Sequence, residues 1–164
     1  QDLARDEHYR RTGIQFQQFN TVFQLIAAAG STSLQHAEQA LLMPDLLTSW
    51  LGGEPHTDIT NASTTALLDP VTRDWDDAVG AVIEKQTGRR PAELFAPLVE
   101  PGTVVGRRGD AQLVTVASHD TASAVVAVPT DAPNPYFISC GTWSLVGVEP
   151  VSYTHLTLPT ICSV

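Results

Sequence analysis

A histidine and an aspartate, His119 and Asp120, stand side by side in a stretch of small and apolar residues, ASHDTASAVVAVP at 117–129. Both residue types can carry out acid–base chemistry. Ser118 precedes them, so the three residue types of a hydrolase triad are present. Successive side chains of an extended segment point to opposite sides, however, which argues against a triad built from three consecutive residues.

Two structural interpretations compete with catalysis at these positions. Asp120 could cap the N-terminus of a helix over TASAVVAV, a use that stabilises a helix by about 1 kcal/mol. His119 could be a hydrogen-bonded histidine of the core. From the local pattern alone, the helix cap is favoured over catalysis.

The second candidate is SCGTWS at 139–144, a strand, a Gly141-Thr142 turn and a second strand. Such a turn can present backbone N–H groups and a hydroxyl to phosphate oxygens. On its own this evidence is weak, since any β-hairpin can turn at glycine. No GKS, GKT or GxGxxG motif occurs, which argues against a P-loop NTPase and a Rossmann dehydrogenase.

The elements that must position these residues alternate between helix and strand. Helices are predicted over FNTVFQLIAAAG, from Asn20 to Gly30, and over DWDDAVGAVIEKQTGRR, from Asp76 to Gly88. The apolar run 40–43 predicts a buried strand, followed by a helix that begins at Pro44 and ends at Gly52-Gly53.

Further along the chain, TVVG and QLVTVAS predict strands, TASAVVAV a helix that ends before Pro129, and YFISCG with WSLVGVE a hairpin. This alternation predicts an α/β fold. Ligands of such folds bind at the carboxyl ends of strands, and His119 and Asp120 follow QLVTVAS directly.

Composition limits the classes of partner. The 164 residues carry a net charge of -9, which argues against a nucleic-acid or anionic membrane surface and leaves small molecules and proteins. Two cysteines, Cys140 and Cys162, are too few for a disulfide scaffold and favour the cytoplasm. There is no signal-peptide pattern, and the first residue is not methionine, which suggests that the start is missing.

Several motifs together resemble the FGGY family of sugar kinases. ASHDTASAV is followed by SCGTWSLVGVE, and RRTGIQFQQFNT, LLMPDLL, TNASTTALLD and VEPGTVVG precede them in the family's order. The resemblance extends over nearly all of residues 8–149 and is greatest for the branch that acts on L-rhamnulose. L-Fuculose kinases share HDT and GTW, but an acidic residue would be expected in place of Ser144.

The resemblance implies an actin/hexokinase-like fold, in which two RNase H-like α/β lobes close over ATP and sugar. Residues 1–129 would be the C-terminal part of the first, sugar-binding lobe, and 130–150 a linker and the first hairpin of the second, nucleotide-binding lobe. The phosphate loop and the rest of the second lobe would be missing, so we expect the 164-residue chain to be inactive alone.

The resemblance also implies roles for individual residues. Asp120 would be the general base that accepts the proton of the C1 hydroxyl of L-rhamnulose, and His119 and Thr121 would hydrogen-bond the sugar together with it. Thr142, with Gly141, would hold the phosphates of ATP, with Mg²⁺ neutralising their charge. Asn61 and Trp143 also lie in family-like motifs and are expected to be structural, and no residues are assigned as protein ligands of a metal.

The tail at 151–164, VSYTHLTLPTICSV, departs from the family and resembles translated adapter or vector sequence. We expect it to be non-native, although Leu156, Leu158 and Ile161 could pack as a divergent strand. Alternatives remain for function: another FGGY kinase, acting on L-fuculose or D-xylulose, or a non-catalytic α/β binding module.

Overall fold

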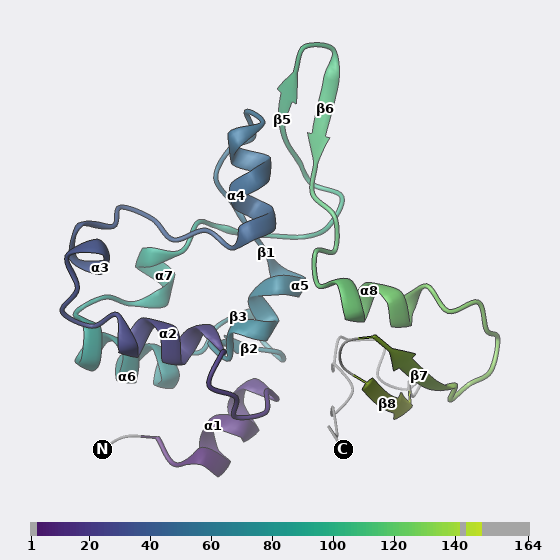
Figure 1. Ribbon diagram of the computed structural model, residues 1–164, viewed down its shortest axis with the longest axis horizontal. Coiled ribbons are helices and arrows are strands. Elements are labelled where there is room, and N and C mark those ends of the chain that lie inside the picture. Colours follow the sequence, from purple (N-terminus) through teal and green to yellow (C-terminus); the bar gives the residue numbers. More distant parts are fainter. Residues whose placement is uncertain (1–2, 142–143, 149–164) are drawn as a thin grey trace. The chain divides into compact units, whose positions relative to one another are not determined.

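The computed structural model describes residues 3–141 and 144–148, and it mixes short helices with short strands (Figure 1). The tail at 151–164 and the residues Thr142 and Trp143 lie outside this range. The elements are α1 (Arg5–Thr12), α2 (Thr21–Ala27), α3 (Thr32–His36), α4 (Met43–Trp50), β1 (Thr57–Asp58), α5 (Ile59–Ala62), the 3₁₀ turn η1 (Ser63–Thr65), β2 (Leu68–Asp69), β3 (Asp74–Trp75), α6 (Asp77–Thr87), α7 (Pro91–Leu94), β4 (Leu98–Val99), β5 (Val104–Arg108), β6 (Ala111–Val114), α8 (Asp120–Val126), β7 (Tyr136–Cys140) and β8 (Ser144–Val148).

The chain divides into two compact units, Gln1–Ser118 and His119–Val164. The motifs predict a boundary between two lobes later in the chain, between residues 129 and 130, and this boundary stays a prediction. No helix in the described part of the chain is long and apolar enough to cross a membrane.

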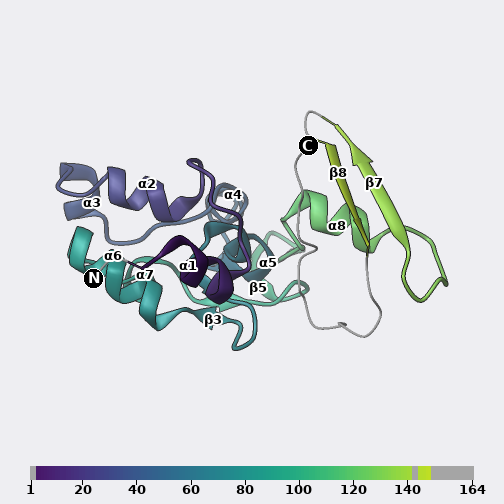
Figure 2. The same ribbon diagram turned by 90° about the horizontal axis from the view of Figure 1, so that it is seen from below.

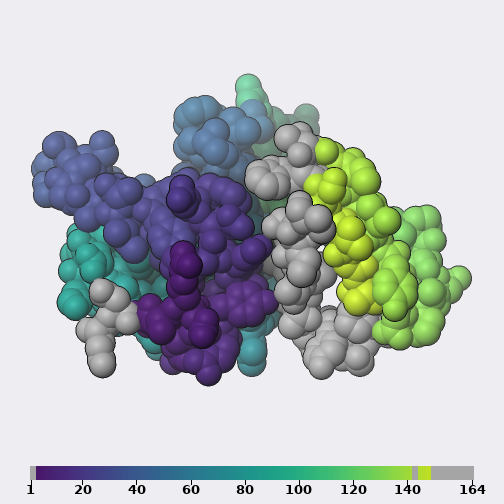
Figure 3. Space-filling view, turned by 60° about the horizontal axis from the view of Figure 1, so that its bottom comes forward, coloured from purple at the N-terminus to yellow at the C-terminus, as the bar shows by residue number. Residues whose placement is uncertain are grey.

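The core of the first unit lies between α2 and α6, which run side by side in Figures 1 and 2. Each helix buries apolar side chains at helical spacing, Val22 and Leu25 from α2 and Val79 and Ile83 from α6. Other buried members of this cluster are Leu34, Ala66, Leu67, Leu94 and Phe95. Figure 3 shows the purple N-terminal residues and the teal residues of α6 and α7 in one continuous surface.

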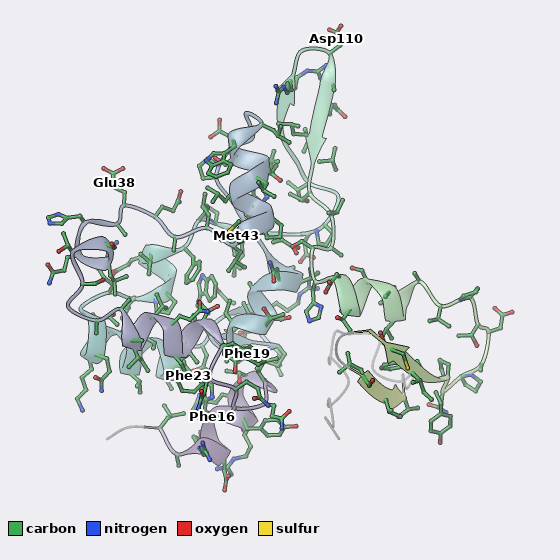
Figure 4. All side chains as sticks on the ribbon, in the orientation of Figure 1. Phe16, Phe19, Phe23, Glu38, Met43 and Asp110 are labelled. Carbon is green, nitrogen blue, oxygen red and sulfur yellow. The ribbon has the colours of Figure 1, made fainter. Side chains whose placement is uncertain are left out.

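Aromatic side chains extend this core toward α1. The rings of Phe16 and Phe23 meet edge to face, with their centroids 4.5 Å apart, and Figure 4 shows both between α1 and α2. His8 of α1 is buried, and its Nε2 lies 2.8 Å from the carbonyl oxygen of Ala66. These contacts attach the first helix to the core.

Helix α6 has the ends that the sequence predicted. The carboxylate of Asp76 accepts a hydrogen bond from the Val79 N–H at 2.8 Å, so it caps the N-terminus. Gly88 ends the helix in the left-handed region, at φ +75°, where glycine carries no Cβ penalty. The prediction of this helix is confirmed.

The apolar run 40–43 does not form the strand that we predicted. Only Ala40 makes a bridge, parallel to Phe95, and Met43 already belongs to α4. A short apolar run fits a buried strand and the start of a helix equally well, and here Pro44 in the first turn favours the helix. The predicted helix beginning at Pro44 is confirmed to within one residue.

Strand pairing in the first unit brings distant segments together. β1 pairs in parallel with β4, with Asp58 opposite Val99, and β5 forms an antiparallel hairpin with β6, whose tip carries Asp110 (Figure 4). Gly106 of β5 bridges to Gly53 after α4, and a Cβ on Gly106 would lie 2.9 Å from the Gly52 oxygen. Glycine is therefore required where these two backbones cross.

The second unit contains α8, which contacts β7, and the antiparallel pair of β7 and β8. The pairing runs from Tyr136 opposite Val148 to Cys140 opposite Ser144. The predicted helix over TASAVVAV and the predicted pairing of the two final strands are both confirmed.

Candidate functional site

The motif His119-Asp120-Thr121 lies at the start of α8. The helix begins here because the ring of His119 accepts a hydrogen bond from the Ala122 N–H through Nδ1, at 3.1 Å. In a neutral ring the proton is then on Nε2. The cap fixes the orientation of the imidazole relative to the first turn of the helix.

Asp120 is not the N-cap that the local pattern predicted, because His119 occupies that position and Asp120 is the first residue of the helix. Histidine is outside the usual set of capping residues, which is why the sequence favoured aspartate. The Asp120 carboxylate is exposed and accepts from the Thr121 N–H at 2.7 Å and from the Thr121 hydroxyl at 3.3 Å. These contacts hold the carboxylate beside the hydroxyl of Thr121.

The predicted phosphate-binding residues, Gly141 and Thr142, lie between β7 and β8 in the sequence. Gly141 is exposed and directly follows β7, the strand that α8 contacts. Thr142 and Trp143 lie outside the described residues. The structure thus brings His119, Asp120 and Thr121 together on one helical turn and places Gly141 in the same compact unit.

A buried carboxylate, that of Asp58, contacts the residue directly before the motif, Ser118. Asp58, 1% exposed, accepts from the Ser118 N–H at 2.9 Å and from the Ser118 hydroxyl at 2.6 Å. Asp58 also caps α5, where it accepts from the N–H groups of Thr60 and Asn61. The sequence gives no signal for Asp58, because the spacing of residues does not indicate a contact across sixty positions.

A second buried acidic side chain lies next to Asp58. Asp45, 2% exposed, accepts from the Asp58 N–H at 3.3 Å, and its other oxygen is 3.4 Å from Nε2 of His56. Burial raises the pKa of Asp45 to about 6. Nδ1 of His56 lies 2.8 Å from the Glu54 carbonyl oxygen, which can only accept, so Nδ1 carries a proton. A hydrogen bond between Nε2 of His56 and the Asp45 carboxyl group then needs a second proton, on either of these two groups.

Asn61, which the motifs marked as structural, lies in α5, and its carbonyl oxygen accepts from the Thr64 hydroxyl at 2.8 Å. These contacts are local to the helical turn. Within residues 3–141 and 144–148, no group of three histidine, cysteine or acidic side chains could hold a metal ion.

The family model for the N-terminal domain of the FGGY family of carbohydrate kinases matches residues 1–124. Since this match covers most of the chain, the chain belongs to the FGGY family of carbohydrate kinases. Among curated proteins, the rhamnulokinase of Bacillus subtilis (strain 168) is 40% identical over 161 residues, which cover 90% of this chain and 31% of that protein. The chain therefore spans about a third of the length of this relative.

Two solved structures resemble the chain in fold. A ligand-bound xylulose kinase from Lactobacillus acidophilus has a TM-score of 0.67 at 17% identity, covering 86% of this chain and 30% of that one. A xylulose kinase from Brucella ovis has a TM-score of 0.65 at 25% identity, covering 85% of this chain and 30% of that one. The fold is part of the actin/hexokinase-like fold of sugar kinases, as the motifs predicted.

Proposed function

We propose that this chain is part of an ATP-dependent kinase that phosphorylates L-rhamnulose at O1, giving L-rhamnulose 1-phosphate and ADP. The observation that carries the proposal is the 40% identity to a rhamnulokinase along 90% of the chain. The two xylulose kinases are less similar in sequence, at 17% and 25% identity. Rhamnulose is therefore the first substrate to test.

Asp120 is the proposed general base. Its exposed carboxylate would accept the proton of the C1 hydroxyl as that oxygen attacks the γ-phosphate. An ionised carboxylate has about four acceptor positions, so it can accept from Thr121 and from a sugar hydroxyl at the same time. The contacts from Thr121 would orient the carboxylate, and orientation is the main contribution of a protein to phosphoryl transfer.

His119 and Thr121 are proposed to bind the sugar. The imidazole of His119 is oriented by the Ala122 N–H, and a histidine ring can hydrogen-bond a sugar hydroxyl. The Thr121 hydroxyl can donate to or accept from a sugar hydroxyl. Both side chains are half-buried and share the helical turn that carries Asp120.

Gly141 and Thr142 are proposed to bind the phosphates of ATP, the phosphoryl donor. Gly141 directly follows β7, so its backbone N–H lies at the end of a strand, and the Thr142 hydroxyl is proposed as the second donor to phosphate. Mg²⁺ would accompany the nucleotide, since it is usually held by phosphates and water with one or two carboxylates, and it would neutralise phosphate charge. The proposed setting is the cytoplasm, with a ketose and ATP as partners and neither nucleic acid nor membrane.

The test is ADP release by the full-length gene product, because the chain spans about a third of its relative's length. L-Rhamnulose, L-fuculose and D-xylulose are compared at equal concentration. We expect the highest kcat/KM with L-rhamnulose. A preference for D-xylulose or L-fuculose would replace the substrate within the family, and no ADP release with any ketose would favour a non-catalytic binding module.

A further inference from the structure

We propose that Asp58 is a positioning residue for the proposed kinase reaction, because its carboxylate fixes Ser118, the residue directly before His119 and Asp120. This inference rests on the proposed function. It concerns a residue far from the motif in sequence, and it follows from the contacts that Asp58 makes in the first compact unit.

Asp58 accepts more hydrogen bonds than a helix cap requires. The N–H groups of Thr60 and Asn61 lie at 3.3 and 3.2 Å, and these two bonds alone cap α5. The Thr60 hydroxyl adds a third bond at 2.5 Å, and the N–H and hydroxyl of Ser118 add two more at 2.9 and 2.6 Å. The two Ser118 bonds have no part in capping α5, so a cap alone does not explain them.

The chemistry of these contacts explains why a carboxylate occupies the position. All five contacting groups donate, four of them to Oδ2 of Asp58 and only the Thr60 N–H to Oδ1. An asparagine with its amide oxygen at the Oδ2 position would keep four of these partners, but its NH₂ group would face the Thr60 N–H, and the charge that strengthens the two Ser118 bonds would be lost. Asp58 is 1% exposed, and buried charge-assisted bonds are stronger and more specific in geometry than those at the surface.

Asp58 is itself held in place. It belongs to β1, which pairs in parallel with β4, and its own N–H donates to the buried carboxylate of Asp45. Ser118, the last residue before the motif, is therefore hydrogen-bonded to a residue of strand β1. A displacement of about 1 Å at a reacting group can lower a rate by about 10²-fold, so a fixed point of this kind can affect catalysis.

The test compares Asp58→Asn and Ser118→Ala in the full-length protein, with L-rhamnulose and ATP as substrates. We expect each variant to lower kcat by about tenfold with little change in the KM for sugar, because the base is less well placed while the sugar contacts remain. Ser118→Thr keeps the hydroxyl and should keep most of the activity. The double variant should be little worse than either single variant, since both substitutions weaken the same contact.

Asp76→Asn is the matched control. Asp76 is another buried aspartate that caps a helix, α6. Asparagine can keep this cap but loses the ion pair with Arg11, so the substitution should lower stability modestly without lowering the kcat of the folded protein. If the wild-type protein is active and both Asp58→Asn and Ser118→Ala keep the wild-type kcat, the positioning role is overturned and the proposed kinase function stands. A wild-type protein without activity on any ketose would overturn the proposed function, and the positioning role with it. If Asp58→Asn fails to fold, Ser118→Ala and Ser118→Thr still decide the question.

Discussion

Replacing Asp45 with asparagine should change how the stability of the protein depends on pH. Burial raises the pKa of Asp45 from 3.8 to about 6, and the negative charge of Asp58 acts in the same direction. The Asp58 N–H and the charge of His56 oppose these effects. The folded state therefore binds this proton more tightly than the unfolded chain does.

The sign and size of the effect follow from this difference. Below about pH 4 the carboxyl group is protonated in both states, and its contribution to stability is fully present. As the pH rises through about 6, the contribution is lost, and a difference of about 2 pKa units corresponds to about 3 kcal/mol. Above about pH 7 there is almost no further change from this group.

Asparagine cannot titrate, yet it fits the same contacts. Its oxygen can accept from the Asp58 N–H, and its NH₂ group can donate to Nε2 of a neutral His56. We expect the free energy of unfolding of Asp45→Asn, relative to wild type, to increase by about 3 kcal/mol between about pH 4 and about pH 7.

The assay is urea unfolding followed by tryptophan fluorescence, with wild type and variant compared at each pH. Glu38→Gln serves as the control, because Glu38 is an exposed acid (Figure 4) and its substitution should give a difference that is nearly constant with pH. A wild-type-to-Asp45→Asn difference that stays flat with pH, or falls as the pH rises, would refute the reasoning about the buried carboxyl group.

Three further predictions concern other elements. Thr142→Val in the full-length protein should raise the KM for ATP about tenfold or more, because a hydrogen bond to a charged phosphate contributes about 1.5–3 kcal/mol; a KM that does not change would exclude this contact. Asp76→Ala should destabilise the fold by about 1–2 kcal/mol through loss of the α6 cap and of the 3.3 Å ion pair with Arg11, as measured by denaturant unfolding. Ile83→Ala, at the centre of the core, should cost about 2–5 kcal/mol in the same measurement, and a value below that of Asp76→Ala would contradict the packing described for α6.

Local sequence signals predicted the elements whose ends have clear chemistry. Helix α6 has an aspartate cap at one end and a glycine at the other, and its apolar face repeats at helical spacing, so the sequence defined it well. The run 40–43 was misread because four apolar residues carry too short a pattern to separate strand from helix.

The start of α8 shows how far the boundary of a helix can be predicted from the sequence. His119 and Asp120 can both accept a hydrogen bond from the first turn, and sequence preference selected Asp120, whereas the structure uses His119. The shift by one residue matters for the proposed chemistry, because it leaves the Asp120 carboxylate exposed and uses the histidine ring to begin the helix.

The contacts that support the motif could not be predicted from spacing. Asp58 and Ser118 meet because separate segments pack in the first unit, and the fold places Asp45 and His56 around Asp58. In the sequence, HTDITNAS offers only a histidine and an aspartate two positions apart. Tertiary packing, and not local pattern, makes this group of side chains a buried network.

The most direct test of the central claim is the turnover of L-rhamnulose by the full-length protein with Asp120→Asn. Loss of a general base should lower kcat by about 10²- to 10⁴-fold while the sugar still binds with nearly wild-type affinity, because asparagine keeps the size of the side chain and removes only its basicity. Equilibrium binding of L-rhamnulose, measured by calorimetry, separates the two effects. A variant with wild-type kcat would contradict the assignment of Asp120 as the base and the mechanism built on it.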